Sequence, residues 1–245
     1  MTDRRSNESP KLSLWHRFVN KAIRFLVRTL LVPWFLPKVI GHRKPTVPGK
    51  AILFANHHHM CDPIFITLFY KTDRLSFVAK KELYRIPCVQ TILDAFHSIK
   101  LDRQVTDMHA AKSILKALRM DRIVGLFMQG TRVAADDITS AEPKEVLLYY
   151  AIRHRIPVIL VGITPNYRLF GRPRFAFSDT LLMTMKNKSK LTPDEQTSIG
   201  HEVMRQIYQL GGLSYEPDGM DEHRAVFERE IEVRPYLEAY NGGAI

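Results

Sequence analysis

The fold of this 245-residue chain is decided by one stretch, Ala51-Ile52-Leu53-Phe54-Ala55-Asn56-His57-His58-His59-Met60-Cys61-Asp62-Pro63. Its first five residues are apolar, as in a buried strand, and a second, largely apolar run follows at 64–70. Proline suits the first turn of a helix. The sequence therefore predicts a strand at 51–55, a polar turn, and a helix over 62–70.

His57 and Asp62 are predicted to be a general base and the carboxylate that orients it. Five residues of a regular helix turn by about 500°, so two such side chains do not share a helical face. They can meet if His57 lies in the turn and Asp62 in the first helical turn. Asp62 would then accept the Nδ1 hydrogen and leave Nε2 as a base near neutral pH. At the carboxyl end of a strand, this base would face the crevice where α/β sheets bind ligands.

Two other interpretations of the histidines stay open. His57 and His59, with Cys61 or Asp62, could ligate a metal, but a zinc site would need further ligands at helical spacing, so no metal is expected. Alternatively, the histidines are structural, with one in the core and two in solvent. Two cysteines in the whole chain provide no disulfide framework and fit a reducing compartment.

Apolar runs alternate with amphipathic segments along the chain, which indicates βαβ units and an α/β fold with a largely parallel or mixed central sheet flanked by helices. Further strands are expected at 75–80, 96–101, 123–128 and 158–163, with an edge strand at 174–178. Helices are expected at 109–120, 144–153 and 192–210, the last opened by the capping box Thr192–Glu195.

The first 50 residues concentrate the positive charge. They contain eleven Lys and Arg residues and two acidic residues, so they carry +9 of the net charge of +11. Apolar residues, including both tryptophans, Trp15 and Trp34, recur there at roughly helical spacing. This combination predicts one or two helices, split near Pro33, that lie in the interface of an anionic phospholipid membrane.

A transmembrane span is not expected in this segment. Its longest uncharged stretch, Thr29–Pro37, has nine residues, against about 20 needed to cross a bilayer. No cleavable signal peptide is expected either. We expect a disordered tail at 1–10, membrane-docking helices at 11–40, an α/β domain at 41–215 and a C-terminal extension at 216–245.

The chain resembles the glycerolipid acyltransferases, the superfamily of 1-acyl-glycerol-3-phosphate acyltransferases. His57-x-x-x-x-Asp62 after an apolar strand is similar to their first motif. Three further landmarks follow in order: His97–Arg103 resembles the second motif, Phe127–Arg132 the third, usually Phe-Pro-Glu-Gly-Thr-Arg, and Ile156–Val161 the fourth. The resemblance covers about residues 40–180.

Several positions depart from the family pattern. His97 stands where the second motif usually has glycine, and Lys100 where it has an aromatic residue. In the third motif, Met128 replaces proline and Gln129 replaces glutamate, and in the fourth Leu160 stands where a second proline is common. Because Gln129 keeps the shape of glutamate without its charge, we expect acceptor recognition to be weakened or changed.

The resemblance implies a membrane-associated acyltransferase that moves a fatty acyl group from acyl-CoA or an acyl-carrier-protein thioester to a lysophospholipid hydroxyl. The expected acceptor is 1-acyl-glycerol-3-phosphate, which gives phosphatidic acid in phospholipid biosynthesis. His57 and Asp62 would be catalytic. A glycine turn with a hydroxyl and guanidinium groups suits a phosphate, so the expected substrate-binding residues are Lys80, Arg103, Gln129, Gly130, Thr131 and Arg132.

No cofactor beyond the thioester co-substrate and no nucleic-acid partner is expected. The expected location is the cytoplasmic face of a membrane, with peripheral or monotopic attachment through residues 11–40. Alternatives are an acyltransferase for a different lyso-lipid or hydroxyl acceptor, a catalytically weak anionic-lipid binder, a nucleic-acid binder and a metal hydrolase. The Trp and Leu content of the N-terminal segment favours lipid over nucleic acid as its partner.

Overall fold

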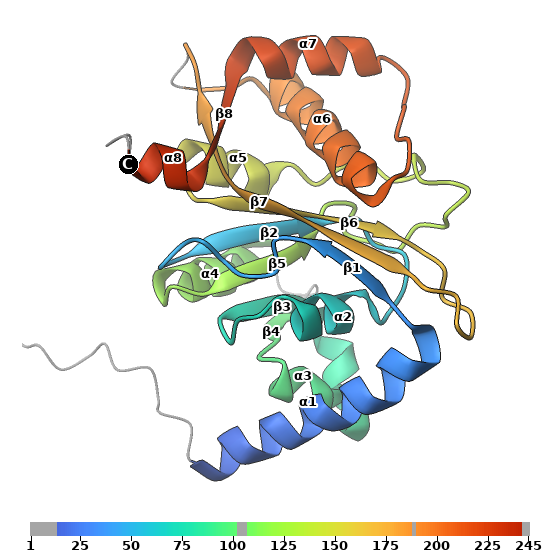
Figure 1. Cartoon of the computed structure of the whole chain (residues 1–245). Helices are drawn as coiled ribbons and strands as arrows, with labels where there is room; N and C mark the ends of the chain where they lie inside the picture. Colours follow the sequence, from blue (N-terminus) through green and yellow to red (C-terminus); the bar gives the residue numbers. More distant parts are fainter. Residues whose placement is uncertain (1–13, 102–106, 188–189, 242–245) are drawn as a thin grey trace, which may run out of the picture.

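A computed structural model describes residues 14–101, 107–187 and 190–241. Within these residues, eight strands form one mixed sheet, which runs through the middle of the molecule (Figure 1). The strand order is β1-β7-β6-β2-β5-β3-β4, and β8 also pairs with β7. The strands are β1 (Lys38–Gly41), β2 (Ala51–Ala55), β3 (Leu75–Lys80), β4 (Ile99–Leu101), β5 (Ile123–Phe127), β6 (Val158–Thr164), β7 (Arg174–Met185) and β8 (Ile231–Pro235).

The parallel part of the sheet brings five strand ends to one edge. Strands β6, β2, β5, β3 and β4 run parallel to one another, so their carboxyl ends lie at the same edge. Strand β7 runs antiparallel to β6 and to β8, and parallel to β1. The structure thus confirms the predicted α/β fold with a mixed central sheet, and it identifies the edge at which the loop after β2 emerges.

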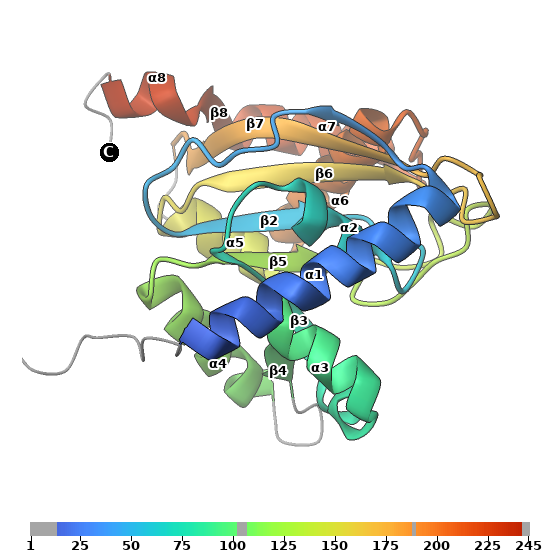
Figure 2. The same ribbon diagram turned by 60° about the horizontal axis from the view of Figure 1, so that its bottom comes forward.

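Helices cover both faces of the sheet (Figures 1 and 2). Side chains alternate along β2, so that Ile52 and Phe54 pack with α4, α5, α6 and α7, whereas Leu53 packs with α2 and the end of α1. The helical elements are α1 (Leu14–Phe35), α2 (Asp62–Phe69), η1 (Lys81–Arg85), α3 (Pro87–Ala95), α4 (Asp107–Arg119), α5 (Val146–Arg153), α6 (Pro193–Gly211), α7 (Met220–Glu230) and α8 (Tyr236–Asn241).

Most expected elements are present, and the differences have physical reasons. The capping box Thr192–Glu195 opens α6 as predicted. The N-terminal helix is single, because Pro33 lies in its last turn and does not divide it. The strand expected from residue 96 begins at Ile99, because residues 87–95 form α3, a helix that was not predicted from the sequence.

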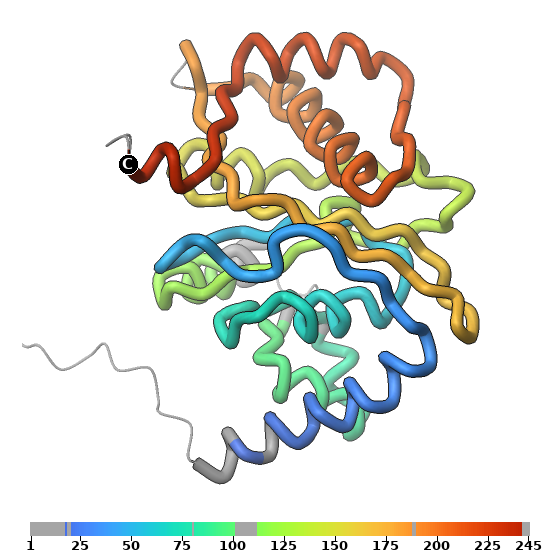
Figure 3. The backbone as a smooth tube through the Cα atoms, in the orientation of Figure 1, coloured from blue at the N-terminus to red at the C-terminus, as the bar shows by residue number. Residues whose placement is uncertain are grey.

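The predicted edge strand at 174–178 is wrong in both length and position. It is the first part of β7, a 12-residue strand that lies between β6 on one side and β1 and β8 on the other. Strand β8 comes from the segment expected as a C-terminal extension and joins the sheet through β7. The backbone trace in Figure 3 shows how α7, β8 and α8 return the chain to the sheet. The tail expected at 1–10 lies outside the described residues.

Candidate active site

Asp62 is the centre of the hydrogen-bond network after β2. Its carboxylate is fully buried, with an exposed fraction of 0%. Oδ2 lies 2.9 Å from Nδ1 of His57 and accepts the backbone N–H groups of His58 and His59, each at 2.7 Å. Oδ1 accepts the hydroxyl hydrogen of Tyr167. Buried charges persist in proteins when they are hydrogen-bonded in this way, so the turn is folded around one carboxylate.

His57 has the orientation of a base whose second ring nitrogen is available. Its side chain is 17% exposed, and its ring stacks on Phe127 at the end of β5, with 3.8 Å between ring centroids. Since Asp62 can only accept, Nδ1 carries the hydrogen of this bond. Within the residues that the structure describes, Nε2 has no hydrogen-bond partner. The predicted contact between His57 and Asp62 is therefore present, in the predicted geometry.

The backbone of His57 is fixed at both of its polar groups by the segment after β5. The N–H of His57 donates to Oε1 of Gln129 at 3.0 Å, and the C=O of His57 accepts the N–H of Val133 at 3.0 Å. Residues 130–132 lie between these two anchors and are exposed. Gly130 permits the turn because its φ is +65°, a value that L-residues rarely adopt. Thr131 and Arg132 consequently lie on the surface beside His57.

Gln129 does not occupy the expected position. Its side chain is 2% exposed, and its Nε2 donates to the hydroxyl of Tyr208 on α6 at 2.6 Å, while Oε1 is bonded to His57. Both ends of the amide are thus used inside the protein. We expected Gln129 among the substrate-binding residues; in the structure its side chain hydrogen-bonds to the backbone of His57 and to Tyr208.

Two tyrosines complete the site, and neither was anticipated from the sequence. Tyr167, in the loop between β6 and β7, donates to Asp62 and stacks on His59 at 4.2 Å between ring centroids. Burial, followed by the nearby carboxylate of Asp62, raises the pKa of Tyr167 far above its usual range, so it remains a donor. Burial likewise raises the pKa of Tyr208 to about 12. No local pattern marks these tyrosines, because their partners are distant in sequence.

His58 is a structural histidine. Its Nδ1 lies 3.0 Å from the C=O of Val133, and its Nε2 lies 2.9 Å from Nδ2 of Asn56. The amide of Asn56 also pairs with both backbone groups of Ile163 in β6. A carbonyl can only accept and the amide nitrogen only donates, so His58 is neutral with its hydrogen on Nδ1. Burial lowers the pKa of His58, in agreement with this assignment.

The geometry offers little to a metal ion. Within the described residues, no group of three or more His, Cys, Asp or Glu side chains is arranged to hold one. Nδ1 of His59 accepts the N–H of Cys61, at 3.2 Å. Burial, with a contribution from Asp62, raises the pKa of the Cys61 thiol to about 11, which disfavours the thiolate that metals bind.

The expected phosphate-binding cations are only partly described. Arg103 lies outside the described residues. Lys80 is the last residue of β3 and therefore lies at the same sheet edge as the loop of His57. Arg132 is close enough to His59 that its charge contributes, after burial, to lowering the pKa of His59. Of the predicted set, the structure brings Gly130, Thr131 and Arg132 to the His57–Asp62 pair.

The model of the Acyltransferase family matches residues 37–164, just over half of the chain. This chain belongs to the Acyltransferase family. The matched segment runs from just before β1 to the end of β6 and contains His57, Asp62 and the segment 129–133.

Individual members of the family are more distant. The 1-acyl-sn-glycerol-3-phosphate acyltransferase of Bacillus subtilis (strain 168) is 26% identical over 97 residues, which are 39% of this chain and 49% of that protein. The chain thus matches about half the length of this curated relative. The crystal structure of the 1-acyl-sn-glycerophosphate acyltransferase PlsC from Thermotoga maritima has 22% sequence identity and a TM-score of 0.57, with 82% of this chain and 83% of that chain covered. At this identity the similarity shows a shared fold.

Proposed function

We propose that this member of the Acyltransferase family transfers a fatty acyl group from a thioester to the free hydroxyl of a lysophospholipid, with 1-acyl-glycerol-3-phosphate as the acceptor and phosphatidic acid as the product. The observation that carries the proposal is the His57–Asp62 pair. Its Nδ1 is fixed by a buried carboxylate, and its Nε2 points away from that carboxylate at the edge where five strands end.

The reaction needs one base and no protein nucleophile. Nε2 of His57 takes the proton of the acceptor hydroxyl as the oxygen attacks the thioester carbonyl. Collapse of the tetrahedral intermediate expels the donor thiolate, which receives the same proton from the imidazolium. The carboxylate of Asp62 stabilises this imidazolium, because it lies 2.9 Å from Nδ1 in the buried turn. The sequence contains no Gly-x-Ser-x-Gly, which agrees with direct transfer.

The phosphate of the acceptor would bind beside His57. Thr131 and Arg132 are exposed and lie between the two residues that fix the His57 backbone. A hydroxyl and a guanidinium suit a phosphate, because arginine binds it with two parallel hydrogen bonds. Lys80, the last residue of β3, and Arg103 are proposed as further cations of this site. The donor is either acyl-CoA or acyl-carrier-protein thioester.

The acceptor would reach the site from a membrane on which α1 lies. One face of α1 packs on α2 and α3 through residues such as Val27, whereas its other face leaves large apolar side chains exposed. These are Phe18, Phe25, Leu26, Leu30 and Trp34. Figure 2 shows α1 lying across the front of the molecule, with no other element drawn over it. Exposed Lys21 and Arg28 would contact anionic headgroups at the cytoplasmic face.

In the part of the chain that is described, none of the helices has the length and apolar character required for a membrane span.

The test is an acyl-transfer assay with the His57→Ala variant, in which lysophosphatidate vesicles and both kinds of thioester donor are supplied. We expect the rate to fall by about 10²- to 10⁴-fold, the usual contribution of a general base, with the fold retained. His154→Ala, a change at an exposed histidine after α5, is the matched control. A near-parental rate in the His57 variant would refute the assignment of His57 as the general base. Mass spectrometry of products from a panel of lyso-acceptors tests the acceptor.

A further inference from the structure

The loop between β6 and β7 carries two exposed apolar residues at the tip of a turn. The N–H of Gly171 donates to the C=O of Arg168 at 2.9 Å, so residues 168–171 form a turn with Leu169 and Phe170 in its centre. The exposed fractions of Leu169 and Phe170 are 53% and 59%. Glycine is required at 171, since a Cβ there would meet the backbone oxygen of Asn166. The turn thus holds an apolar pair in water.

The backbone of Phe170 is also in an unfavourable conformation. Its φ is +56°, and a position of this kind in a turn ordinarily holds glycine or asparagine. A bulky aromatic residue with positive φ is strained by contact between its Cβ and the backbone. Packing in the core does not explain the residue, because the side chain is mostly exposed. Strain and exposure together point to a role for Phe170 at a surface.

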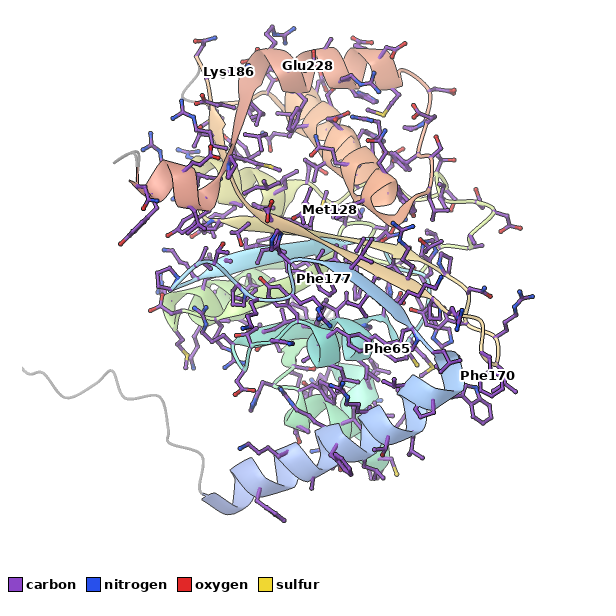
Figure 4. All side chains as sticks on the ribbon, viewed as in Figure 1. Phe65, Met128, Phe170, Phe177, Lys186 and Glu228 are labelled. Carbon is purple, nitrogen blue, oxygen red and sulfur yellow. The ribbon has the colours of Figure 1, made fainter. Side chains whose placement is uncertain are left out.

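The turn is continuous with the exposed apolar side of α1. The N–H of Phe170 donates to the C=O of Trp34 at 2.8 Å, and the N–H of Arg172 donates to the C=O of Phe35 at 2.9 Å. Trp34 is itself 57% exposed. Figure 4 shows Phe170 beside the carboxyl end of α1. Leu169 and Phe170 therefore extend the apolar surface of the helix across a second element.

Three exposed cations lie in or next to the turn. Arg168 and Arg172 flank the apolar pair and are exposed, as is Lys38 at the start of β1. The loop sequence, residues 165–173, contains no acidic residue. Aromatic and aliphatic side chains bordered by arginines match the interface of an anionic bilayer, where the former enter the acyl boundary and the latter meet phosphate groups.

We propose that the β6–β7 loop is a second membrane-contacting element, which inserts Leu169 and Phe170 beside Trp34 into the interface of an anionic bilayer. The inference rests on the membrane association in the proposed function and deepens it. Tyr167 in the same loop donates to Asp62. Docking of the turn therefore places the His57–Asp62 pair close to the lipid surface from which the acceptor comes.

The first test places a fluorescent reporter at the tip. Phe170→Trp is made in a Trp15→Phe/Trp34→Phe background, and anionic phosphatidylglycerol vesicles with or without brominated acyl chains are added. We expect a blue-shifted emission that the brominated lipid quenches. The control is Tyr240→Trp, at an exposed position in α8. Helix α8 follows β8, which pairs with the end of β7 that is remote from the β6–β7 loop. Emission from position 170 that is unaffected by vesicles would overturn the proposal.

The second test separates a structural role from a lipid-binding role. Phe170→Gly removes the strain as well as the side chain, so we expect a higher Tm together with about tenfold weaker vesicle binding. KM for vesicle-borne acceptor should rise about tenfold, with kcat within twofold. Leu237→Ser, a change at an exposed residue of α8, should leave vesicle binding and KM unchanged. Vesicle affinity of Phe170→Gly within twofold of the parent would contradict the proposal.

The two proposals fail in different ways. Vesicle binding needs no turnover, so a responding Phe170→Trp protein without acyl-transfer activity would support the loop contact and reject the enzymatic function. An active enzyme with a silent reporter at 170 would reject the loop contact alone.

Discussion

The backbone N–H of His57 donates to Oε1 of Gln129, across an N···O distance of 3.0 Å. The other end of this amide is bonded to the hydroxyl of Tyr208, so that a buried chain of hydrogen bonds runs from α6 to the proposed base. The position of His57 thus depends on a residue that never reaches the surface.

Replacing Gln129 by leucine should lower both the stability of the protein and its kcat. Gln129→Leu leaves the His57 N–H and the Tyr208 hydroxyl without this partner. The free energy of unfolding should fall by about 1–3 kcal/mol, the cost of buried polar groups left unsatisfied, and kcat should fall at least about tenfold. Urea denaturation and single-substrate kinetics measure the two effects. Gln209→Leu, on the exposed side of α6, is the matched control; equal losses in both variants would argue against the role of Gln129.

Replacing Gln129 by glutamate should leave acceptor choice unchanged. In Gln129→Glu, the carboxylate can still accept the His57 N–H, and the Tyr208 hydroxyl can turn its hydrogen toward it. Because the side chain is 2% exposed, we expect the same order of preference among lyso-acceptors, as read by mass spectrometry of products. A changed order would show that position 129 acts on the acceptor after all.

Removing the Tyr167 hydroxyl should weaken the orientation of the base without opening the site. Tyr167→Phe keeps the ring contacts with His59 and Phe35 and removes one donor to the buried carboxylate of Asp62. A hydrogen bond to a charged group contributes about 1.5–3 kcal/mol, so kcat should fall about tenfold or more. KM should change little. A larger change in KM than in kcat would mean that Tyr167 contacts substrate instead.

Stability should decrease as the pH is lowered through the range in which histidines titrate. Burial lowers the pKa of His58, and the same direction holds for His59, His97 and His201. The unfolded chain therefore binds more protons than the native protein below the usual histidine pKa of about 6.5. Their stabilising effect is fully present above this pH and is lost as the pH falls toward the native pKa.

The variant His58→Asn should reduce this pH dependence. One such group changes the slope by at most about 1.4 kcal/mol per pH unit. The measurement is the free energy of urea unfolding between pH 5 and 8, with the exposed-site variant His154→Asn alongside. Parallel curves for the parent and the His58 variant would exclude His58 as a contributor.

His97 stands at a position that favours glycine. Its φ is +54°, and it follows α3 in a Schellman-type end, in which the N–H of His97 donates to the C=O of Asp94 and that of Ser98 to Leu93. His97→Gly should therefore raise the free energy of unfolding by up to about 1 kcal/mol, since it removes left-handed strain. His154, with φ at −101° after α5, is the control; His154→Gly should not stabilise.

Local patterns predicted the elements that depend on neighbours in sequence. The apolar run 51–55 and Pro63 defined β2, the turn and α2, and therefore the meeting of His57 with Asp62. The glycine expected at position 97 by family resemblance matches the positive φ found there. The central position of β7 could not be predicted in this way, because it is created by pairing with β1 and β8, which come from opposite ends of the chain.

The supporting residues of the site escaped prediction for a similar reason. Tyr167 contacts a residue 105 positions earlier, and Tyr208 one that is 79 positions earlier. Such contacts leave no periodicity in a single sequence. The burial of Gln129 could not be predicted either, because polarity alone does not tell whether an amide faces a ligand or the interior of the protein.

The segment matched by the family ends at residue 164, whereas Tyr167 and Tyr208 lie beyond it. A graft of residues 37–164 into another scaffold would transfer the base and its carboxylate but leave both tyrosines behind. The recipient would have to supply one hydroxyl group that bonds to Asp62 and another that bonds to Gln129, so that the grafted His57 keeps its orientation. Chimeras between distant family members are therefore expected to function only when the exchanged block extends through α6.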